Sequence, residues 1–449
     1  MCWKVEYIIL IIISTLIDYF VAKKMSSLKI KTKRKKWLTL SLISNLGILF
    51  GFKYFNFVNE NIQVFFDQFN IFYNVPSFDL LLPVGISFYT FQTLSYTIDV
   101  YNNKTSCANH LGIFAVYVSF FPQLVAGPIE RSNRLLPQFF KKQIFSFNRV
   151  KAGLQQMLWG FFKKVVIADR LAIIVDGVYN NPNDYSGFAL IIATVFFAFQ
   201  IYCDFSGYSD IAIGSAKIMG YEVMDNFKRP CFSKSISEFW KRWHISLSSW
   251  FKDYVYIPLG GNRVLKWRWY YKLFITFLVS GLWHGANWTF VVWGALHGLY
   301  LILAIFFAQQ KNYLINLFNI RNSYFHKLYQ VSSTFFLVVF AWIFFRANNL
   351  SDAIYIISNI FSSIGEYTDI RNIKVQMRGI GVGLNDILIS ITLIFIMELY
   401  NVYERDDNVW DKLEQKPQWV RWAFYYLLLF GILFLAPYSN VNNFIYFQF

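Results

Sequence analysis

Charged residues are scarce in this chain. Only 15% of its 449 residues are Asp, Glu, Lys or Arg, whereas soluble globular domains carry roughly 25%. Hydrophobic residues make up 56%, and many apolar runs reach the roughly 17 to 25 residues that a helix needs to cross a bilayer. The short alternating segments of a membrane β-barrel are absent. The composition therefore excludes a soluble protein and predicts an all-α polytopic membrane protein, because helices satisfy their own backbone groups in lipid.

Several chemical signatures are also missing. The four cysteines lie far apart, at Cys2, Cys107, Cys203 and Cys231, without metal-ligand spacing or a disulfide framework. The sequence has no P-loop, dinucleotide fingerprint, HExxH motif or nucleophile elbow. We therefore expect neither a metal site nor a permanently bound cofactor.

The apolar runs predict ten or eleven transmembrane or re-entrant helices in one integral membrane domain, residues 1–449. The first run is interpreted as a retained N-terminal anchor, because it lacks the small-residue cleavage site of a signal peptide. The order of apolar and polar stretches along the chain shows no repeat of fixed period. The predicted segments are 5–22, 37–57, 79–99, 111–128, 152–179, 187–203, 271–308, 327–345, 352–364, 384–400 and 420–437.

The net charge of +16 is explained by where the basic residues lie. Eight of them fall between Lys23 and Lys36, directly after the first apolar run, and ten fall between Lys228 and Lys272, against two acidic residues. Cytoplasmic loops of membrane proteins collect Lys and Arg, so both segments are predicted to be cytoplasmic. We expect a multi-pass protein of the plasma or inner membrane, in contact with lipid and without a nucleic-acid partner.

His284 is the first candidate catalytic residue. It lies in region 271–308, where residues 273–308 contain no Asp, Glu, Lys or Arg. Such a run would make a helix of roughly 54 Å, too long for one crossing, so it must bend or divide. Gly281 and Gly285 flank His284 and supply the break. An ionisable residue at membrane depth is a functional candidate by default, although a neutral, hydrogen-bonded core histidine is the alternative. His297 has no polar neighbour in the sequence and is predicted to be a packing residue.

His244 is the second candidate and lies in the cytoplasmic basic region 207–270. Ser235 and Glu238 form a capping-box pattern that predicts a helix start. Helical spacing over 235–251 then predicts one continuous amphipathic helix, with His244 on its polar stripe. A simple interfacial helix fits the periodicity equally well.

The basic residues of this region have two explanations that composition cannot separate. A positive-inside loop accounts for all of them, whereas a cytoplasmic funnel would attract an anionic donor such as coenzyme A. Under the second explanation the candidates for binding the donor phosphates are Lys241, Arg242, Lys252 and Arg263. Asp204 and Asp210 end an apolar run and are predicted to be structural.

Five segments, in order, resemble the membrane-bound O-acyltransferases, and specifically their alginate and peptidoglycan O-acetyltransferase branch. They are LPVGISFYTFQTLSYTIDVY, FPQLVAGPIERS, YCDFSGYSDIAIG, WHISLSSWFKDYVYIPLGGNR and GLWHGANWTFVVWGALHG. The resemblance covers roughly residues 15 to 440. It implies tilted helices around a membrane tunnel and two functional histidines, which match His284 and His244.

The resemblance also implies a reaction. An acetyl group would pass from a cytoplasmic thioester, with acetyl-CoA as the expected donor, to a hydroxyl of a cell-surface or secreted polysaccharide, helped by an SGNH-type acetyltransferase outside the membrane. D-alanyl transferases of teichoic acid share both histidines but not YIPLGGNR, so D-alanyl transfer is the second hypothesis. A transporter or flippase, the hypothesis from another class, predicts internal repeats and paired broken helices, and neither is evident.

Overall fold

The computed structural model describes residues 5–78, 82–83, 85–125, 127–362, 370–404, 409–438 and 444–445, and every regular element in these ranges is a helix. The all-α prediction is therefore confirmed. Six of the described helical segments are long and apolar enough to cross a membrane. They are Lys31–Gln68, Phe188–Ile218, Trp288–Phe306, Tyr324–Arg346, Leu384–Tyr403 and Gln418–Leu435.

The helices follow one another with short connections. Their bounds are α1 Ile8–Ser27, α2 Lys31–Leu49, α3 Phe55–Gln68, α4 Ile86–Tyr101, α5 Leu111–Ser119, α6 Phe121–Leu124, α7 Ser132–Leu135, α8 Phe147–Phe161, α9 Asp169–Tyr179, α10 Phe188–Ile218, α11 Ile236–Arg242, α12 Ile245–Phe251, α13 Lys266–His284, α14 Trp288–Phe306, α15 Ala308–Leu317, α16 Tyr324–Arg346, α17 Leu350–Asn359, α18 Ile370–Gly379, α19 Leu384–Tyr403, α20 Val409–Glu414 and α21 Gln418–Leu435. Three π-helical turns join neighbouring helices, namely η2 Phe50–Tyr54, η4 Phe162–Ala168 and η7 Lys252–Tyr256.

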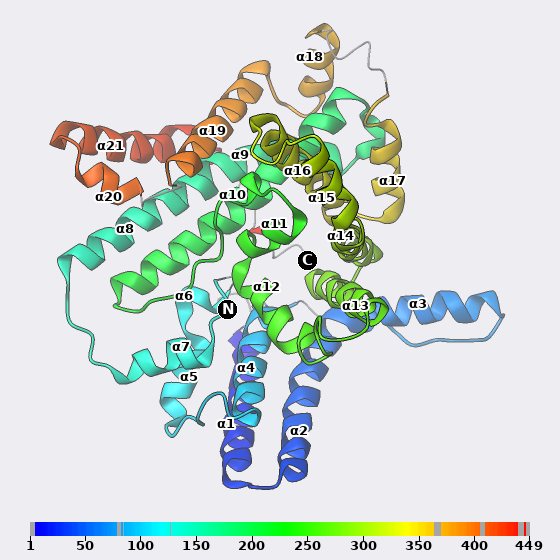
Figure 1. Cartoon of the computed structure of the whole chain (residues 1–449), viewed down its shortest axis with the longest axis vertical. Helices are drawn as coiled ribbons and strands as arrows, with labels where there is room; N and C mark the ends of the chain where they lie inside the picture. The colour runs from blue at the N-terminus through cyan, green and yellow to red at the C-terminus, as the bar shows by residue number, and fades with distance from the viewer. Residues whose placement is uncertain are drawn as a thin grey trace.

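The short helices α11 and α12 lie at the centre of the molecule. The helices α4, α10, α13, α14 and α16 surround them, with α8 outside α10 and α19 to α21 at the periphery (Figure 1). Helices α1, α2 and α4 form a group that projects to one side, and α3 projects as a separate arm (Figure 1). Residues 235–251, which carry His244, are therefore enclosed by the longer helices.

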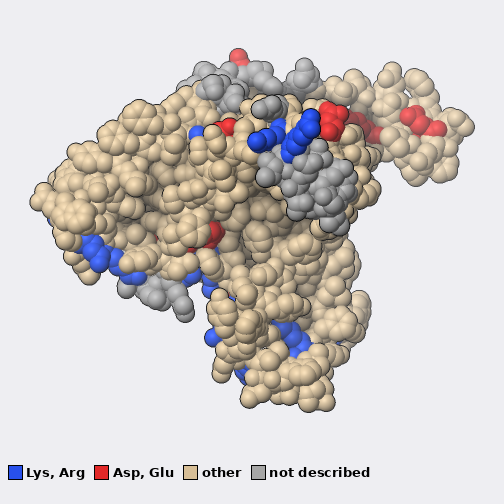
Figure 2. Space-filling view, turned by 90° about the horizontal axis from the view of Figure 1, so that it is seen from above, with Lys and Arg blue, Asp and Glu red and all other residues tan. Residues whose placement is uncertain are grey.

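The face of the molecule shown in Figure 2 carries little charge. In Figure 2 the Lys, Arg, Asp and Glu side chains form a few small groups, and other residues cover most of the face shown. Large apolar side chains point outward from several candidate spans, including Phe336 (60% exposed), Phe395 (62%) and Phe434 (78%). Apolar surface of this extent is unfavourable in water and is the surface that lipid covers, in agreement with the predicted membrane contact.

Helices α8 and α10 pack backbone to backbone through two glycine pairs. A Cβ on Gly160 would lie 2.7 Å from the Gly207 carbonyl oxygen, and one on Gly153 would lie 2.7 Å from that of Gly214. Within each helix the two glycines are seven residues apart, so they lie on the same helix face. This close approach brings the lysines of η4 to the acidic residues of α10.

The predicted span 187–203 is too short, because α10 continues to Ile218. Asp204 and Asp210 thus lie inside the helix, and the region 207–270 begins within it. They are tolerated there because they are paired. Lys163 Nζ lies 2.5 Å from Asp210 Oδ2, and Lys164 Nζ lies 2.7 Å from Asp204 Oδ1. These pairs agree with the structural role predicted for the two aspartates.

Two other predicted spans differ from the structure. The span 111–128 is wrong, because α5 ends at Ser119 and the chain bends at Phe120 before the single turn of α6. The span 37–57 continues through η2 into α3. Gly85 adopts the left-handed φ of +79° at the start of α4, where a Cβ would overlap the Leu124 carbonyl oxygen. The backbone is therefore irregular at both Phe120 and Gly85.

Candidate active site

His284 is the last residue of α13. The chain is extended at Gly285, and α14 begins at Trp288 with Asn287 as its cap, whose Oδ1 accepts the Thr289 N–H at 3.0 Å. The break predicted at this histidine is confirmed, and the run 273–308 forms parts of two antiparallel helices. His284 is only 4% exposed. Its ring packs against Trp293 of α14 and Phe345 of α16, with centroids 4.9 Å and 5.2 Å away.

Two side chains from η2 bind the carboxyl end of α13. Lys53 Nζ donates to the carbonyl oxygens of Trp283 (2.8 Å) and His284 (2.9 Å), and Tyr54 Oη donates to that of Leu282 (2.9 Å). The last carbonyls of a helix have no partner inside the helix and carry partial negative charge, so a cation stabilises them. The η2 turn therefore fixes where His284 lies. Sequence reasoning missed Lys53, although a lysine within an apolar run was a usable signal.

His244 does not lie on a continuous helix, and this sequence prediction is wrong. Helix α11 ends at Arg242, His244 has a left-handed φ of +43°, and α12 begins at Ile245. The predicted helix start is correct, since Ser235 Oγ accepts the Glu238 N–H at 3.1 Å. His244 is completely buried rather than displayed on a polar stripe. Burial lowers the pKa of its imidazole to about 3, so the ring is neutral at physiological pH.

The structure brings the two predicted histidines together around one indole. The Trp283 ring centroid lies 5.0 Å from that of His284 and 6.2 Å from that of His244. Phe88 adjoins both His244 and Trp283, and Trp293 lies 4.9 Å from His284. A pair of histidines that are 40 positions apart in the sequence thus shares one buried aromatic cluster.

His297 is buried in the same cluster, as expected of a packing residue, but it does have a polar neighbour. The Trp240 indole N–H donates to its Nδ1 at 3.2 Å. His110 caps α5, where its Nδ1 accepts the Ile113 N–H.

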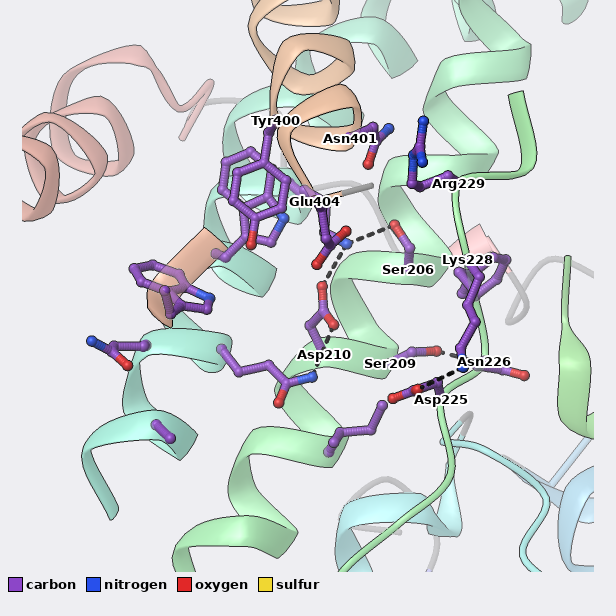
Figure 3. A pocket seen from close by; sticks show the side chains of 18 of the residues that line it. Ser206, Ser209, Asp210, Asp225, Asn226, Lys228, Arg229, Tyr400, Asn401 and Glu404 are labelled. Atoms are coloured by element: carbon purple, nitrogen blue, oxygen red, sulfur yellow. Dashed lines mark hydrogen bonds and ion pairs between the residues drawn. The ribbon is translucent and has the colours of Figure 1, made fainter. Parts of the chain in front are cut away.

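A large polar cavity of about 920 Å³ opens on one side of the histidine pair. It is bounded by Ser206, Ser209 and Asp210 of α10, by Asn226, Lys228 and Arg229 of the following loop, and by Tyr400, Asn401 and Glu404 (Figure 3). Its lining includes six basic and five acidic side chains, so its charge is nearly balanced. Asn226 is in direct contact with His244, which places this histidine behind the cavity wall.

A second cavity of about 560 Å³ is lined by Gly285, the residue directly after His284, and is called the Gly285 cavity here. Its lining includes Lys53, Asp176, Gly285, Asn287 and Arg346. Arg346 is itself paired with Asp176 at 2.6 Å.

The two cavities lie at opposite ends of α10. Residues just before this helix, Asp176 and Asn180, line the Gly285 cavity, while its second half, from Ser206 to Lys217, lines the polar cavity. The helix has 31 residues and is therefore roughly 46 Å long. His244 contacts Asn226 in the wall of the polar cavity, and His284 directly precedes Gly285 in the wall of the other, so the histidine pair lies between the two cavities.

The four predicted phosphate-binding residues are divided among different places. Lys241 and Arg242 line the polar cavity, where Arg242 also pairs with Glu238 at 2.5 Å. Lys241 and Lys252 line a third cavity of about 450 Å³ between α12, η7, α13 and α14. Arg263 is exposed in the loop before α13 and lines none of these three cavities.

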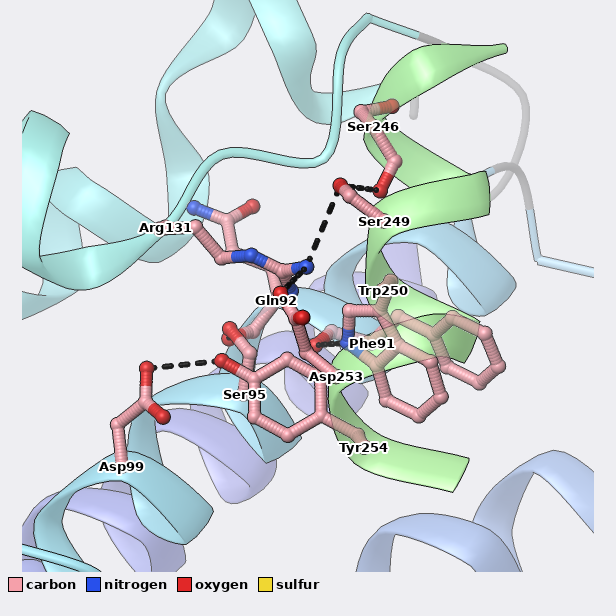
Figure 4. Close-up of polar contacts among 10 residues, drawn as sticks. All are labelled: Phe91, Gln92, Ser95, Asp99, Arg131, Ser246, Ser249, Trp250, Asp253 and Tyr254. Atoms are coloured by element: carbon pink, nitrogen blue, oxygen red, sulfur yellow. Dashed lines mark hydrogen bonds and ion pairs between the residues drawn. The ribbon is translucent and has the colours of Figure 1, made fainter. Parts of the chain in front are cut away.

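Arg131 binds α12 and η7, and aromatic residues of these two elements pack against α4. Its Nη2 lies 3.3 Å from Asp253 Oδ2, and its guanidinium lies over the Tyr254 ring at 4.6 Å (Figure 4). Tyr254 Oη in turn donates to Asp99 on α4 at 2.8 Å. Phe91 and Trp250 stack beside this group with centroids 3.7 Å apart. These contacts fix the helix that begins directly after His244.

The fold and the site define a polytopic membrane protein in which two buried histidines lie between two cavities. The family model for the membrane-bound O-acyltransferase family matches residues 109–351, which include both histidines. The chain belongs to this family.

Three similar proteins carry three different names. The chain is 42% identical over 349 residues to the probable alginate O-acetylase AlgI of Pseudomonas syringae pv. tomato, a match that covers 78% of this chain and 65% of the relative. It is 35% identical over 390 residues to the peptidoglycan O-acetyltransferase of Helicobacter pylori, covering 80% and 71%. The teichoic acid D-alanyltransferase of Streptococcus thermophilus is 29% identical over 252 residues, covering 52% and 59%. The chain therefore spans about two thirds of the length of its alginate O-acetylase relative.

Proposed function

We propose that this protein transfers an acetyl group from a thioester in the polar cavity to a hydroxyl group that enters through the Gly285 cavity. The observation that carries the proposal is the position of His284 and His244 between these two cavities. The relatives named as alginate and peptidoglycan O-acetylases support a cell-surface or secreted polysaccharide as the final acceptor. The D-alanyltransferase match is weaker and shorter, which keeps D-alanyl transfer as the second candidate.

In the proposed reaction His284 acts as general base. It accepts the proton of the acceptor hydroxyl, the oxygen attacks the thioester carbonyl carbon, and the C–S bond breaks. The departing thiolate then takes the proton from His284 and leaves as a thiol. His244 positions the donor or polarises its carbonyl. A thioester is already activated, so the step balances without a metal.

The Gly285 cavity suits a hydroxyl-rich acceptor, because amide side chains from three elements line it. These are Asn180, Asn287 and Asn348, next to the Arg346–Asp176 pair. Amides both donate and accept hydrogen bonds, as hydroxyl recognition requires.

An SGNH-type acetyltransferase outside the membrane is the proposed partner that completes delivery to the polymer. The proposed location is the plasma or inner membrane.

The proposed donor gives a first prediction. Coenzyme A should raise the unfolding temperature of the detergent-purified protein, because a ligand that binds only the folded state stabilises it. At a concentration 100 times its Kd the gain would be about 2.7 kcal/mol. Lys241→Gln should weaken this protection, whereas Lys104→Gln, an exposed change in the loop before α5, should not. Protection by a D-alanyl carrier protein, with none by coenzyme A, would favour the second candidate function.

The orientation gives a second prediction. Helix α2 begins in the basic segment and its continuation η2 ends beside His284, while α13 runs from Lys266 to the same point. Both basic segments therefore lie at the end away from the Gly285 cavity. In a variant without native cysteines, exposed Ser27→Cys and Asn262→Cys should resist an impermeant thiol reagent in intact cells, and exposed Ser351→Cys, near the Gly285 cavity, should react. Labelling of the first two positions from outside would reverse the orientation and remove the cytoplasmic donor.

A further inference from the structure

Asn226 makes an unusual set of contacts with the residues around His244. Its side-chain oxygen Oδ1 lies 3.1 Å from His244 Nδ1, 3.2 Å from the Ser246 backbone nitrogen and 2.9 Å from Ser246 Oγ. Its backbone carbonyl accepts the Ile245 N–H at 2.9 Å. Asn226 therefore binds the first turn of α12 and the histidine at the same time, from a loop 18 residues earlier in the chain.

The orientation of the Asn226 amide follows from these contacts. A backbone N–H can only donate, so the amide atom that faces Ser246 must be the oxygen. An oxygen in that position cannot donate to the imidazole, and it can only accept. Ser246 Oγ also lies 3.4 Å from His244 Nδ1, but its hydroxyl donates to Asn226 Oδ1 at the shorter distance of 2.9 Å. The His244 nitrogen that faces the amide oxygen, Nδ1, therefore carries the proton of the neutral ring. Its other nitrogen, Nε2, carries the lone pair.

We infer that Asn226 is a positioning residue that holds His244 in the Nδ1–H tautomer and so makes its Nε2 a hydrogen-bond acceptor toward the reactants. The inference rests on the proposed function and decides between the two roles that the proposed reaction leaves open for His244. A neutral His244 in this tautomer cannot polarise a thioester carbonyl, because that requires a donor. It can position the donor by accepting an N–H, such as the amide groups of a pantetheine arm provide.

The backbone of His244 supports this role independently. Its φ of +43° lies in the left-handed region that non-glycine residues rarely adopt, and such conformations persist where the surroundings enforce them. The backbone N–H groups of Ile245 and Ser246 both donate hydrogen bonds to Asn226, and these bonds constrain the backbone at His244. Ring contacts with Phe205 at 4.5 Å and Trp283 at 6.2 Å fix the other sides of the imidazole.

The tautomer can be tested without any activity. In a sample with ¹⁵N-labelled histidine, the nitrogen signals of His244, assigned by their loss in His244→Ala, should show a protonated Nδ1 and an unprotonated Nε2 in the wild type. Protonation at Nε2 instead would overturn the inference, even if the protein proved to be an acetyltransferase. A protein with the expected tautomer but no acetyl transfer would instead refute the proposed function.

Variants of Asn226 test its effect on turnover. Asn226→Ala should lower kcat by about 10- to 100-fold, the size of effect that loss of orientation produces, with little change in the KM for the donor. Asn226→Asp should restore most of the activity and the Nδ1–H tautomer, because a carboxylate accepts the same three hydrogen bonds. Asn349→Ala, which removes an asparagine cap at α17, is the matched control and should keep normal turnover. A raised donor KM with unchanged kcat in Asn226→Ala, or an inactive but folded Asn226→Asp, would contradict the positioning role.

Discussion

Replacing His284 with Gln should abolish nearly all acetyl transfer while leaving the protein folded. Glutamine keeps a hydrogen-bonding group of similar reach but cannot accept the hydroxyl proton. General-base catalysis typically contributes about 10²- to 10⁴-fold in rate, so His284→Gln and His284→Ala should each lose at least about 100-fold in turnover. Initial rates of transfer from a labelled thioester to an acceptor saccharide would measure the loss. Elution from a sizing column and the unfolding temperature should stay close to wild type.

His297 supplies the matched control for this prediction. It is a second buried histidine of the same aromatic cluster, with its ring 4.9 Å from that of Trp293, which also contacts His284. His297→Gln keeps an acceptor for the Trp240 indole N–H and should retain most activity. Near-normal turnover in His284→Gln would show that His284 is structural, and His244 would then become the leading candidate for the base.

The sequence was sufficient to predict the helical membrane class and the break at His284, because both depend on local properties. A charge-free run longer than a bilayer must divide, and glycines beside the histidine weaken the helix at that point. The start of α11 was predictable for the same reason, since Ser235 and Glu238 satisfy the first N–H groups within one turn. These features need no knowledge of the rest of the chain.

The features that sequence reasoning missed depend on contacts between distant residues. Helical periodicity continues through His244, whereas the helix breaks there because Asn226 accepts hydrogen bonds from the backbone amides of the two residues that follow. Lys53 binds carbonyl groups about 230 residues away. Asp204 and Asp210 looked like the end of a span, because composition does not show that lysines of η4 neutralise them inside α10. Pairing, and not hydropathy, decides where these polar residues lie.

The position of His284 also depends on how closely α13 and α14 approach each other, and this leads to a large predicted effect on folding. Gly281 and Gly294 face each other across the two helices. A Cβ on Gly281 would overlap the Phe290 carbonyl oxygen, and one on Gly294 would overlap that of Phe277. Main-chain atoms cannot move aside as a side chain does, so the helices would have to separate. His284 lies only three residues from this contact, at the end of α13.

Gly294→Val should therefore strongly reduce the yield of monodisperse protein and eliminate transfer activity in what remains. Overpacking a well-packed core typically lowers the free energy of unfolding by about 1–3 kcal/mol. Because the valine side chain would overlap backbone atoms of Phe277, we expect a loss near the upper end of that range. Gly47→Ala is the matched control, because nothing lies within 4 Å of a Cβ at that position of α2. It should be neutral or should stabilise the protein by about 0.5–1 kcal/mol, since alanine favours the helix. Fluorescence-detected size-exclusion chromatography and thermal unfolding would measure both variants. Normal yield and activity in Gly294→Val would show that α13 and α14 do not meet at these glycines, and the placement of His284 by this contact would be wrong.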